Sequence, residues 1–214
     1  MEILRIKNVT YSYIGSREKI LSSVSRSFEL GKFYAITGKS GAGKSTMLSL
    51  LAGLDRPNSG DVMFRGENIE RKGYSNHRKN NISLVFQNYN LIDYLSPLEN
   101  IRLVNSNASD EMLLKLGLDK SQIKRNVMKL SGGQQQRVAI ARALASEAPV
   151  ILADEPTGNL DPNTAGEIIE MLKKLAKERN KCVIVVTHSK EVAAAADTIL
   201  ELSNKKLKEV RKDN

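Results

Sequence analysis

The sequence has a single cysteine among its 214 residues, Cys182. One thiol cannot form an internal disulfide, and it excludes zinc or iron–sulfur sites built from clustered cysteines. Cys182 lies in an apolar run, so we expect it to be an ordinary core residue. Long hydrophobic runs are also lacking, because the longest apolar stretches, such as residues 182–186, span about five residues and a membrane helix needs about twenty. The sequence therefore predicts no membrane span.

Linkers and targeting segments are missing as well. No internal repeat, low-complexity tract or stretch rich in proline, glycine and serine divides the chain. The first residues lack the basic start, apolar stretch and small-residue cleavage site of a secretory signal, so we expect a cytoplasmic location. Hydrophobic residues (41%) and charged residues (27%) occur in proportions that exclude a disordered chain. Together these features predict one domain, residues 1–214.

The charge is unbalanced, with 33 lysines and arginines against 24 acidic residues, a net charge of +9. Such a surplus is compatible with nucleic acid, an anionic membrane surface or a phosphate-bearing ligand, and equally with lysine-rich solvated faces. The basic residues gather at residues 71–79 and near the C-terminus, where we note Lys205, Lys206, Lys208, Arg211 and Lys212. Composition alone does not choose among these partners.

Hydrophobic periodicity predicts an α/β fold. Strand candidates occur at residues 33–36, 62–64, 82–86, 150–153, 182–187 and 198–202. Residues 24–30 alternate apolar and polar side chains with Arg26 out of step, and the segment 2–36 predicts an antiparallel N-terminal flank. Helical patterns at 44–52, 134–146 and 167–178 alternate with the later strands, which favours a mainly parallel sheet. Residues 88–130 hold only short helical candidates, at 97–104 and 110–116, and predict a small helical subdomain inserted in the domain.

A phosphate-binding loop follows the strand at 33–36. Residues 38–46 read GKSGAGKST, the pattern G-x-x-x-x-G-K-[ST] between a strand and a helix. Glycines let successive N–H groups point inward at phosphate oxygens, and the helix N-terminus adds its positive dipole end. Lys44 is expected to reach the β- and γ-phosphates, and the Ser45 hydroxyl to ligate Mg²⁺. The predicted nucleotide-binding residues are Gly38, Lys39, Ser40, Gly41, Ala42, Gly43, Lys44, Ser45 and Thr46.

Two adjacent carboxylates, Asp154 and Glu155, end the apolar strand candidate at 150–153. The carboxyl end of a parallel strand near a phosphate loop is where Mg²⁺ needs a second protein ligand, and Asp154 fits that role. Glu155 points to the other side of the extended chain and can activate a water molecule, so it is the candidate general base. The alternative is a pair that only caps the next turn.

A second possible anion site lies at Ser131, Gly132, Gly133 and Gln134, which open a helical run. A hydroxyl and two glycines at a helix start provide free N–H donors for an anion. Taken alone, the same residues are also a common helix cap.

The order and spacing of these three motifs resemble the ATP-binding cassette family over nearly the whole chain, with the family's signature at residues 130–134. The resemblance implies a P-loop NTPase core that binds ATP with Mg²⁺. It also implies a head-to-tail pair, formed with a second copy or a homologous ATPase, in which Ser131 and Gly133 of one subunit close over the γ-phosphate held by the other.

Four further residues stand where this family places functional side chains. Gln87 matches the glutamine that ligates Mg²⁺ or holds the attacking water, and His188 matches the histidine that senses the γ-phosphate. Asp161 matches the aspartate of the D-loop, and Tyr13 the aromatic that stacks on adenine, with Tyr11 a weaker candidate. Taken singly, Gln87 is also compatible with a polar residue at a strand end, His188 with a neighbour of a helix cap, and Tyr13 with an ordinary core residue.

Residues 131–143 and 154–161 resemble a bacterial subfamily of separate ATPase subunits that serve lipoprotein release, macrolide efflux and cell division. This implies a subunit held at the inner face of the cell membrane by a separate transmembrane permease, in efflux or extrusion of a peptide, drug or lipid-linked substrate. Leu91, Ile92, Tyr94 and Leu95 offer a groove for a permease helix or only pack the insert. The insert looks shorter than usual for the subfamily, which leaves this docking surface open.

Two other functions remain. One is an ATPase module that regulates a cell-wall or division complex without transport. The other is a cassette ATPase acting on nucleic acid, but such relatives carry long coiled coils, zinc modules or a second cassette, and this sequence has none. No nucleic-acid partner is therefore expected.

Overall fold

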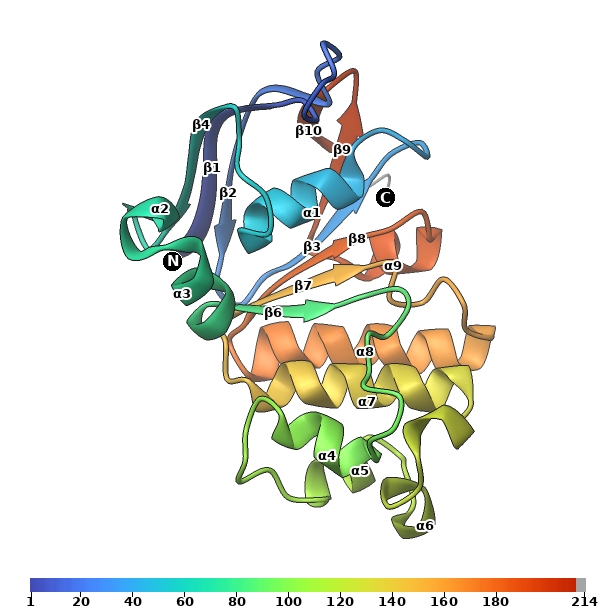
Figure 1. Cartoon of the computed structure of the whole chain (residues 1–214). Coiled ribbons are helices and arrows are strands. Elements are labelled where there is room, and N and C mark those ends of the chain that lie inside the picture. The colour runs from blue at the N-terminus through green and yellow to red at the C-terminus, as the bar shows by residue number, and fades with distance from the viewer. Residues whose placement is uncertain (211–214) are drawn as a thin grey trace.

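The computed structural model describes residues 1–210, so Arg211 and Lys212 of the C-terminal basic group lie outside the described residues. Its centre is a six-stranded sheet in the order β10-β9-β3-β8-β7-β6 (Figure 1). The strands are β3 (Phe33–Thr37), β6 (Ile82–Val85), β7 (Val150–Asp154), β8 (Cys182–Val186), β9 (Thr198–Ser203) and β10 (Lys206–Val210). All neighbours pair in parallel except β10, which pairs antiparallel with β9. The predicted mainly parallel sheet is confirmed.

A second sheet forms the antiparallel flank. It has the order β2-β1-β4-β5, with β1 (Glu2–Tyr11), β2 (Leu21–Glu29), β4 (Ser59–Phe64) and β5 (Glu67–Asn68). The flank predicted from residues 2–36 ends earlier than expected, since the strand at Phe33–Thr37 joins the parallel sheet instead. The reason is burial on both faces, because four of the five β3 residues are buried and lack the alternation of a half-exposed strand.

Helix α1 (Lys44–Ala52) lies between the two sheets, and its apolar residues share one core with both (Figure 1). Helices α7 (Gly132–Ala145), α8 (Pro162–Glu178) and α9 (Lys190–Ala195) cover the other face of the parallel sheet. Cys182 is fully buried, and burial raises the pKa of its thiol to about 12, which confirms an inert core residue. In the described part of the chain, no helix has both the length and the apolar character needed to span a bilayer.

Short helices fill the connections. Helices α2 (Ile69–Lys72) and α3 (Tyr74–Asn80) follow the antiparallel sheet. Helices α4 (Pro97–Arg102) and α5 (Glu111–Lys115) lie against α7, α6 (Lys120–Ile123) lies against α4, and a 3₁₀ turn (Val127–Lys129) leads to α7. The segment 88–130 contains no strand and packs its own apolar cluster on α7, through residues such as Ile101, Leu113 and Val138.

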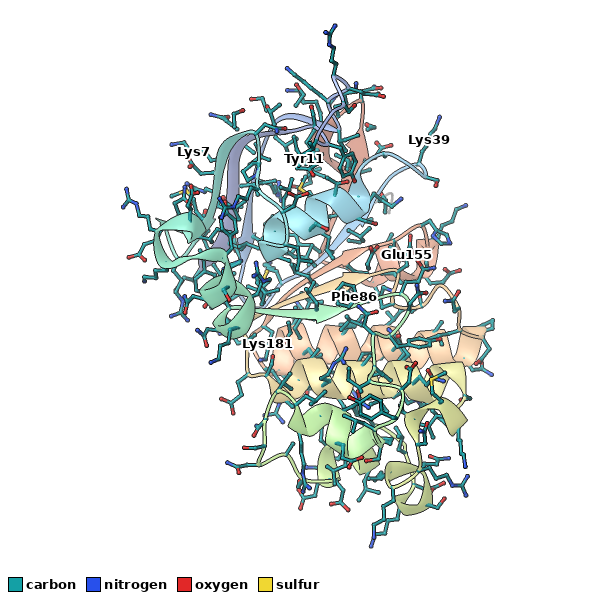
Figure 2. All side chains as sticks on the ribbon, in the orientation of Figure 1. Lys7, Tyr11, Lys39, Phe86, Glu155 and Lys181 are labelled. Carbon is teal, nitrogen blue, oxygen red and sulfur yellow. The ribbon has the colours of Figure 1, made fainter. Side chains whose placement is uncertain are left out.

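The carboxyl ends of the parallel strands place the predicted motifs at one edge of the sheet. The phosphate loop follows β3, Gln87 follows β6, the acid pair closes β7, and His188 follows β8. Figure 2 shows Glu155 at this edge and Lys39 at the outer end of the loop. Ligands of open parallel sheets bind at this edge, so the fold brings these residues together.

Candidate nucleotide-binding site

The phosphate loop curls around the ammonium group of Lys44. Lys44 Nζ donates hydrogen bonds to the carbonyl oxygens of Gly38, at 3.0 Å, and Lys39, at 3.3 Å. Gly43 has a left-handed φ of 97°, and a Cβ at this position would lie 2.5 Å from Ile20 Cγ2. Only glycine therefore lets the loop turn into α1 while its N–H groups face inward.

A cavity of about 430 Å³ lies against this loop, within the usual size of a ligand pocket. It is lined by Tyr13, Ile20, Ser40, Gly41, Gly43, Lys44, Ser45, Thr46, Gln87, Asp154 and Glu155. All but one of these residues were predicted from the sequence. Ile20 was missed, since its only signal is a contact with Gly43 that depends on the tertiary fold.

The two tyrosines near the cavity differ in exposure. The ring of Tyr13 is half exposed, and its hydroxyl forms a 2.6 Å hydrogen bond with Thr46 Oγ1 at the start of α1. Tyr11 is buried and donates its hydroxyl to Asp55, and burial together with Asp55 raises its pKa to about 12. The two rings pack edge to face, with 5.3 Å between their centroids. Tyr13 is thus the ring that can stack on a base, and Tyr11 supports it from the core.

Oxygen ligands for a cation meet at the end of β7. The Asp154 carboxylate is hydrogen-bonded to Ser45, and burial raises the pKa of this acid, with Ser45 and Lys44 opposing part of the effect. Gln87 lines the same cavity. A hydroxyl, an amide and a partly buried carboxylate are oxygen ligands that fit Mg²⁺. Among the described residues no group of three His, Cys, Asp or Glu side chains gathers.

Glu155 is held by the residues that follow β8. Its carboxylate accepts hydrogen bonds from Thr187 Oγ1 at 3.0 Å and from His188 Nδ1 at 2.8 Å, and the backbone N–H of His188 adds a third at 3.3 Å. Its own backbone is left-handed, with a φ of 45°, and its N–H donates to Val186. Such a strained residue, fixed on several sides, is typical of a reacting group.

His188 does not line the nucleotide cavity. Its side chain is 72% exposed and borders an adjoining cavity of about 500 Å³, which shares Glu155 with the first. Thr187 is fully buried and was not singled out from the sequence, although its place between the last residue of β8 and His188 was the available signal.

The signature residues form the start of α7 and line neither of these cavities. The Ser131 hydroxyl accepts the N–H of Gln134 at 3.3 Å, and the Gln134 side chain accepts the N–H of Ser131 at 2.9 Å, a capping box. Gly132 and Gly133 are the first two residues of the helix. Within its own chain this helix start therefore lies outside the phosphate cavity.

Asp161 caps α8. Its carboxylate accepts hydrogen bonds from the N–H groups of Asn163 and Thr164, both at 3.1 Å. The side-chain hydrogen bond with Thr164, followed by these N–H groups, lowers the pKa of Asp161. Like the signature residues, Asp161 does not line the phosphate cavity. The predicted site residues thus divide into a group that meets around the phosphate loop, a group at the starts of α7 and α8, and His188, which contacts Glu155 from the adjoining cavity.

Comparison with known proteins gives one consistent result. A family model described as ABC transporter matches residues 21–158. The ABC transporter ATP-binding protein YclH of Bacillus subtilis is 40% identical over 95% of this chain and 94% of its own length, and the lipoprotein-releasing system ATP-binding protein LolD of Syntrophotalea carbinolica is 36% identical over 94% and 95%. Among solved structures, the dimeric cassette MJ0796 bound to ADP and Pi superposes with a TM-score of 0.87 at 37% identity, covering 99% of this chain and 100% of that one.

Proposed function

The chain belongs to the ABC transporter family, and on that premise we propose that it drives a separate membrane-spanning subunit by binding and hydrolysing ATP. The observation that carries the proposal is the meeting of Lys44, the Ser45–Asp154 pair and Glu155 in one cavity. This set of groups matches what phosphoryl transfer to water needs, namely charge neutralisation around the phosphates and a placed base.

Each side chain has a role in this reaction. The loop N–H groups and Lys44 hold the β- and γ-phosphates, and Tyr13 stacks on the base. Ser45, Asp154 and Gln87 would hold Mg²⁺, which neutralises charge on the phosphate oxygens. Glu155 takes the proton of the attacking water, while Thr187 and His188 fix the orientation of its carboxylate.

The position of the signature residues supports a two-copy unit. Because Ser131, Gly132, Gly133 and Gln134 lie outside the cavity of their own chain, they are available to the ATP of a second copy, as is Asp161. The MJ0796 cassette is itself described as dimeric. ATP would then lie between the copies, and its hydrolysis would release them. A homologous ATPase in place of the second copy would use the same residues.

Two relatives favour a permease partner. The macrolide export protein MacB of Hyphomonas neptunium and the pyoverdine export protein PvdT of Pseudomonas syringae are ATP-binding/permease proteins, and this chain matches 34% and 33% of their lengths. The segment 88–130 of this chain also exposes large apolar side chains, with Tyr94 at 80% and Leu103 at 58%. We place the chain at the cytoplasmic face of the membrane under a separate permease that extrudes a peptide, drug or lipid-linked substrate.

Two substitutions test the ATP chemistry. Lys44→Ala should abolish tight ATP binding. Glu155→Gln should keep ATP bound, lose hydrolysis and shift the protein to a dimer on size exclusion with ATP. Glu178→Gln, at the far end of α8, is the matched control and should behave as the parent. A parental hydrolysis rate in Glu155→Gln would show that Glu155 is not the base.

Affinity purification from the native membrane tests the partner. Recovery of a membrane protein, followed by loss of export when Glu155→Gln replaces the parent, would support transport. Recovery of a division or cell-wall protein without any exported substrate would favour the regulatory alternative. Recovery of DNA without a membrane protein would contradict both.

A further inference from the structure

A further cavity lies at the opposite edge of the parallel sheet from the nucleotide cavity. Its volume is about 480 Å³, within the usual range of a ligand pocket. It is bordered by α5, by the last turns of α7 and α8, and by Lys181, which precedes β8. Figure 2 shows Lys181 and Glu155 at opposite ends of the strands. None of the residues that line this cavity lines the nucleotide cavity, so the proposed ATP chemistry does not account for it.

Part of the lining is apolar and comes from two separate clusters. Met112 and Leu116 pack on the cluster of the segment 88–130, whereas Leu144 and Met171 pack on the cluster beneath the parallel sheet. All four are only partly buried and line the cavity. The described lining residues include no aromatic ring, and flexible thioether and aliphatic side chains adapt well to an alkyl chain. This part of the cavity therefore suits a ligand with an aliphatic body.

The charged part of the lining has one more basic than acidic residue. Its exposed members are balanced, with Lys115, Lys174 and Arg179 on the basic side and Glu111, Glu147 and Glu178 on the acidic side. Lys181 is the remaining charged residue of the lining, and it is half-buried. A cation withdrawn from water favours an anionic partner. The lining thus offers a single surplus positive charge to a ligand.

Two hydrogen bonds hold Lys181 beside the cavity. Its backbone N–H donates to the carbonyl oxygen of Leu175 at 3.2 Å, and its Nζ donates to that of Ala148 at 2.7 Å. An ammonium has three N–H donors, and among the described residues no carboxylate forms an ion pair with this one. Burial lowers the pKa of Lys181, Glu147 opposes this effect, and Arg179 adds to it. The ammonium is therefore fixed, partly desolvated and able to bind an anion.

We propose that this cavity binds a fatty-acid-like amphiphile, with its carboxylate at Lys181 and its alkyl chain against the partly buried apolar residues of the lining. A carboxylate carries one negative charge at neutral pH, which equals the surplus of the lining, whereas a phosphate monoester carries about 1.5–2. Met112 and Leu116 belong to the segment 88–130, and Leu144 and Met171 to α7 and α8, so the alkyl chain would contact both parts of the domain. Binding needs neither nucleotide nor a second copy.

Calorimetric titration of the whole chain with dodecanoate, below its micelle concentration, tests the site. We expect one dodecanoate per chain, with an affinity about tenfold or more above that for dodecyltrimethylammonium, which has the same alkyl chain and a cationic head. Butanoate, which keeps the carboxylate without the long chain, should not bind measurably, and excess ATP should not displace dodecanoate. Absence of saturable binding, displacement by ATP or equal affinity for the two head groups would overturn the inference.

Substitutions test the two parts of the lining separately. Lys181→Met should weaken dodecanoate binding about tenfold or more, as expected for a lost hydrogen bond between charged groups, and Lys181→Arg should restore it to within a few-fold. Met112→Trp should fill the cavity and weaken the binding of both amphiphiles. Lys173→Met is the matched control, because Lys173 lies on α8 but does not line the cavity. Parental affinity in Lys181→Met, or an equal loss in Lys173→Met, would contradict the assignment. If Lys181→Met does not fold, Lys181→Arg, Met112→Trp and the comparison of head groups decide on the same terms.

Nuclear magnetic resonance of isotopically labelled methionine methyl groups locates the ligand. Dodecanoate should shift the signals of Met112 and Met171, which line the cavity, and leave that of Met128 unchanged. Met128 is the control because it is exposed outside the cavity, where a weakly adsorbed amphiphile would also reach it. A shift at Met128 without shifts at Met112 and Met171 would show adventitious binding to exposed apolar side chains and overturn the inference.

Discussion

At the scale of single residues, one buried hydroxyl shows how the site depends on groups that do not touch the nucleotide. Thr187 Oγ1 donates a hydrogen bond to the Glu155 carboxylate and accepts one from the N–H of Ser189, both at 3.0 Å. Among the described residues, no other side-chain hydroxyl donates to Glu155. We expect Thr187→Val to lower kcat about tenfold, since a hydrogen bond to a charged group contributes about 1.5–3 kcal/mol, and to leave KM for ATP nearly unchanged. Steady-state ATPase assays measure both constants. Thr187→Ser should restore the rate, and a Thr187→Val enzyme with parental kcat would refute the positioning role.

Also at the scale of single residues, we expect the Asp154 carboxylate to destabilise the folded protein although the proposed function needs it. Burial raises its pKa in the folded protein, so the folded state binds the proton more tightly than the unfolded chain. The free energy of unfolding must then fall as pH rises through the folded-state pKa, and the ionised carboxylate destabilises the protein at neutral pH. Without nucleotide or metal, Asp154→Asn should melt at or above the temperature of the parent, lose ATPase activity, and lose its advantage as the pH falls. Melting of the variant well below the parent at neutral pH would disprove this account.

At the scale of elements, a helix or strand can be predicted from the sequence when most of its apolar residues are buried in the core. Helix α1 begins and ends where the sequence places it, because left-handed glycines at 43 and 53 bound an apolar run. Helices α2 and α3 were missed since their residues are mostly charged or amide, and only Ile69 and His77 are buried. The residues of the candidate site differ in predictability for the same reason. Its phosphate loop and acids lie beside strands with strong patterns, while Ile20 and Thr187 depend on contacts that only the folded chain creates.

Helix α3 contacts α1 through His77, and this buried histidine predicts a pH dependence of stability. His77 is 1% exposed, its Nε2 donates to the carbonyl of Leu51 at 3.0 Å, and its Nδ1 accepts from Asn81 at 3.2 Å, so both ring nitrogens suit the neutral form. Burial lowers its pKa, with Arg78 acting in the same direction and the bond to Leu51 against it. The unfolded chain therefore binds more protons below about pH 6.5, and the free energy of unfolding falls with decreasing pH, by at most about 1.4 kcal/mol per pH unit.

The measurement is urea unfolding near pH 7.5 and near pH 5.5, on either side of the ordinary histidine pKa. His77→Gln keeps an N–H donor for Leu51 and cannot titrate, so its loss of stability on acidification should be smaller than that of the parent. His188→Gln removes the other histidine of the chain, which contacts Glu155, and measures its separate contribution. Equal acid sensitivity in the parent and His77→Gln would show that His77 is not the responsible group.

At the scale of the whole molecule, two basic regions of this chain, whose net charge is +9, lie on different sides in Figure 1. Lys44 is the one basic residue with a proposed role at the phosphates. One basic region is formed by α2 and α3, with Arg71 and Lys79, and the other by β10, with Lys206 and Lys208. A flat bilayer can contact only one of these regions at a time. If the chain works under a permease, the region that faces anionic lipid should contribute about 1 kcal/mol per well-placed basic residue.

Flotation with vesicles of phosphatidylglycerol and phosphatidylcholine can assign that region. We expect the parent to bind and to be released by salt, because screening weakens such attraction. Arg71→Gln with Lys79→Gln should reduce binding about tenfold or more, whereas Lys206→Gln with Lys208→Gln, an equal change of charge, should have little effect. These two lysines lie on an edge strand and leave the α2–α3 surface intact, which makes the pairs a matched comparison. Equal losses would mean that net charge alone attracts the vesicle, and salt-insensitive binding would exclude an electrostatic contact at either region.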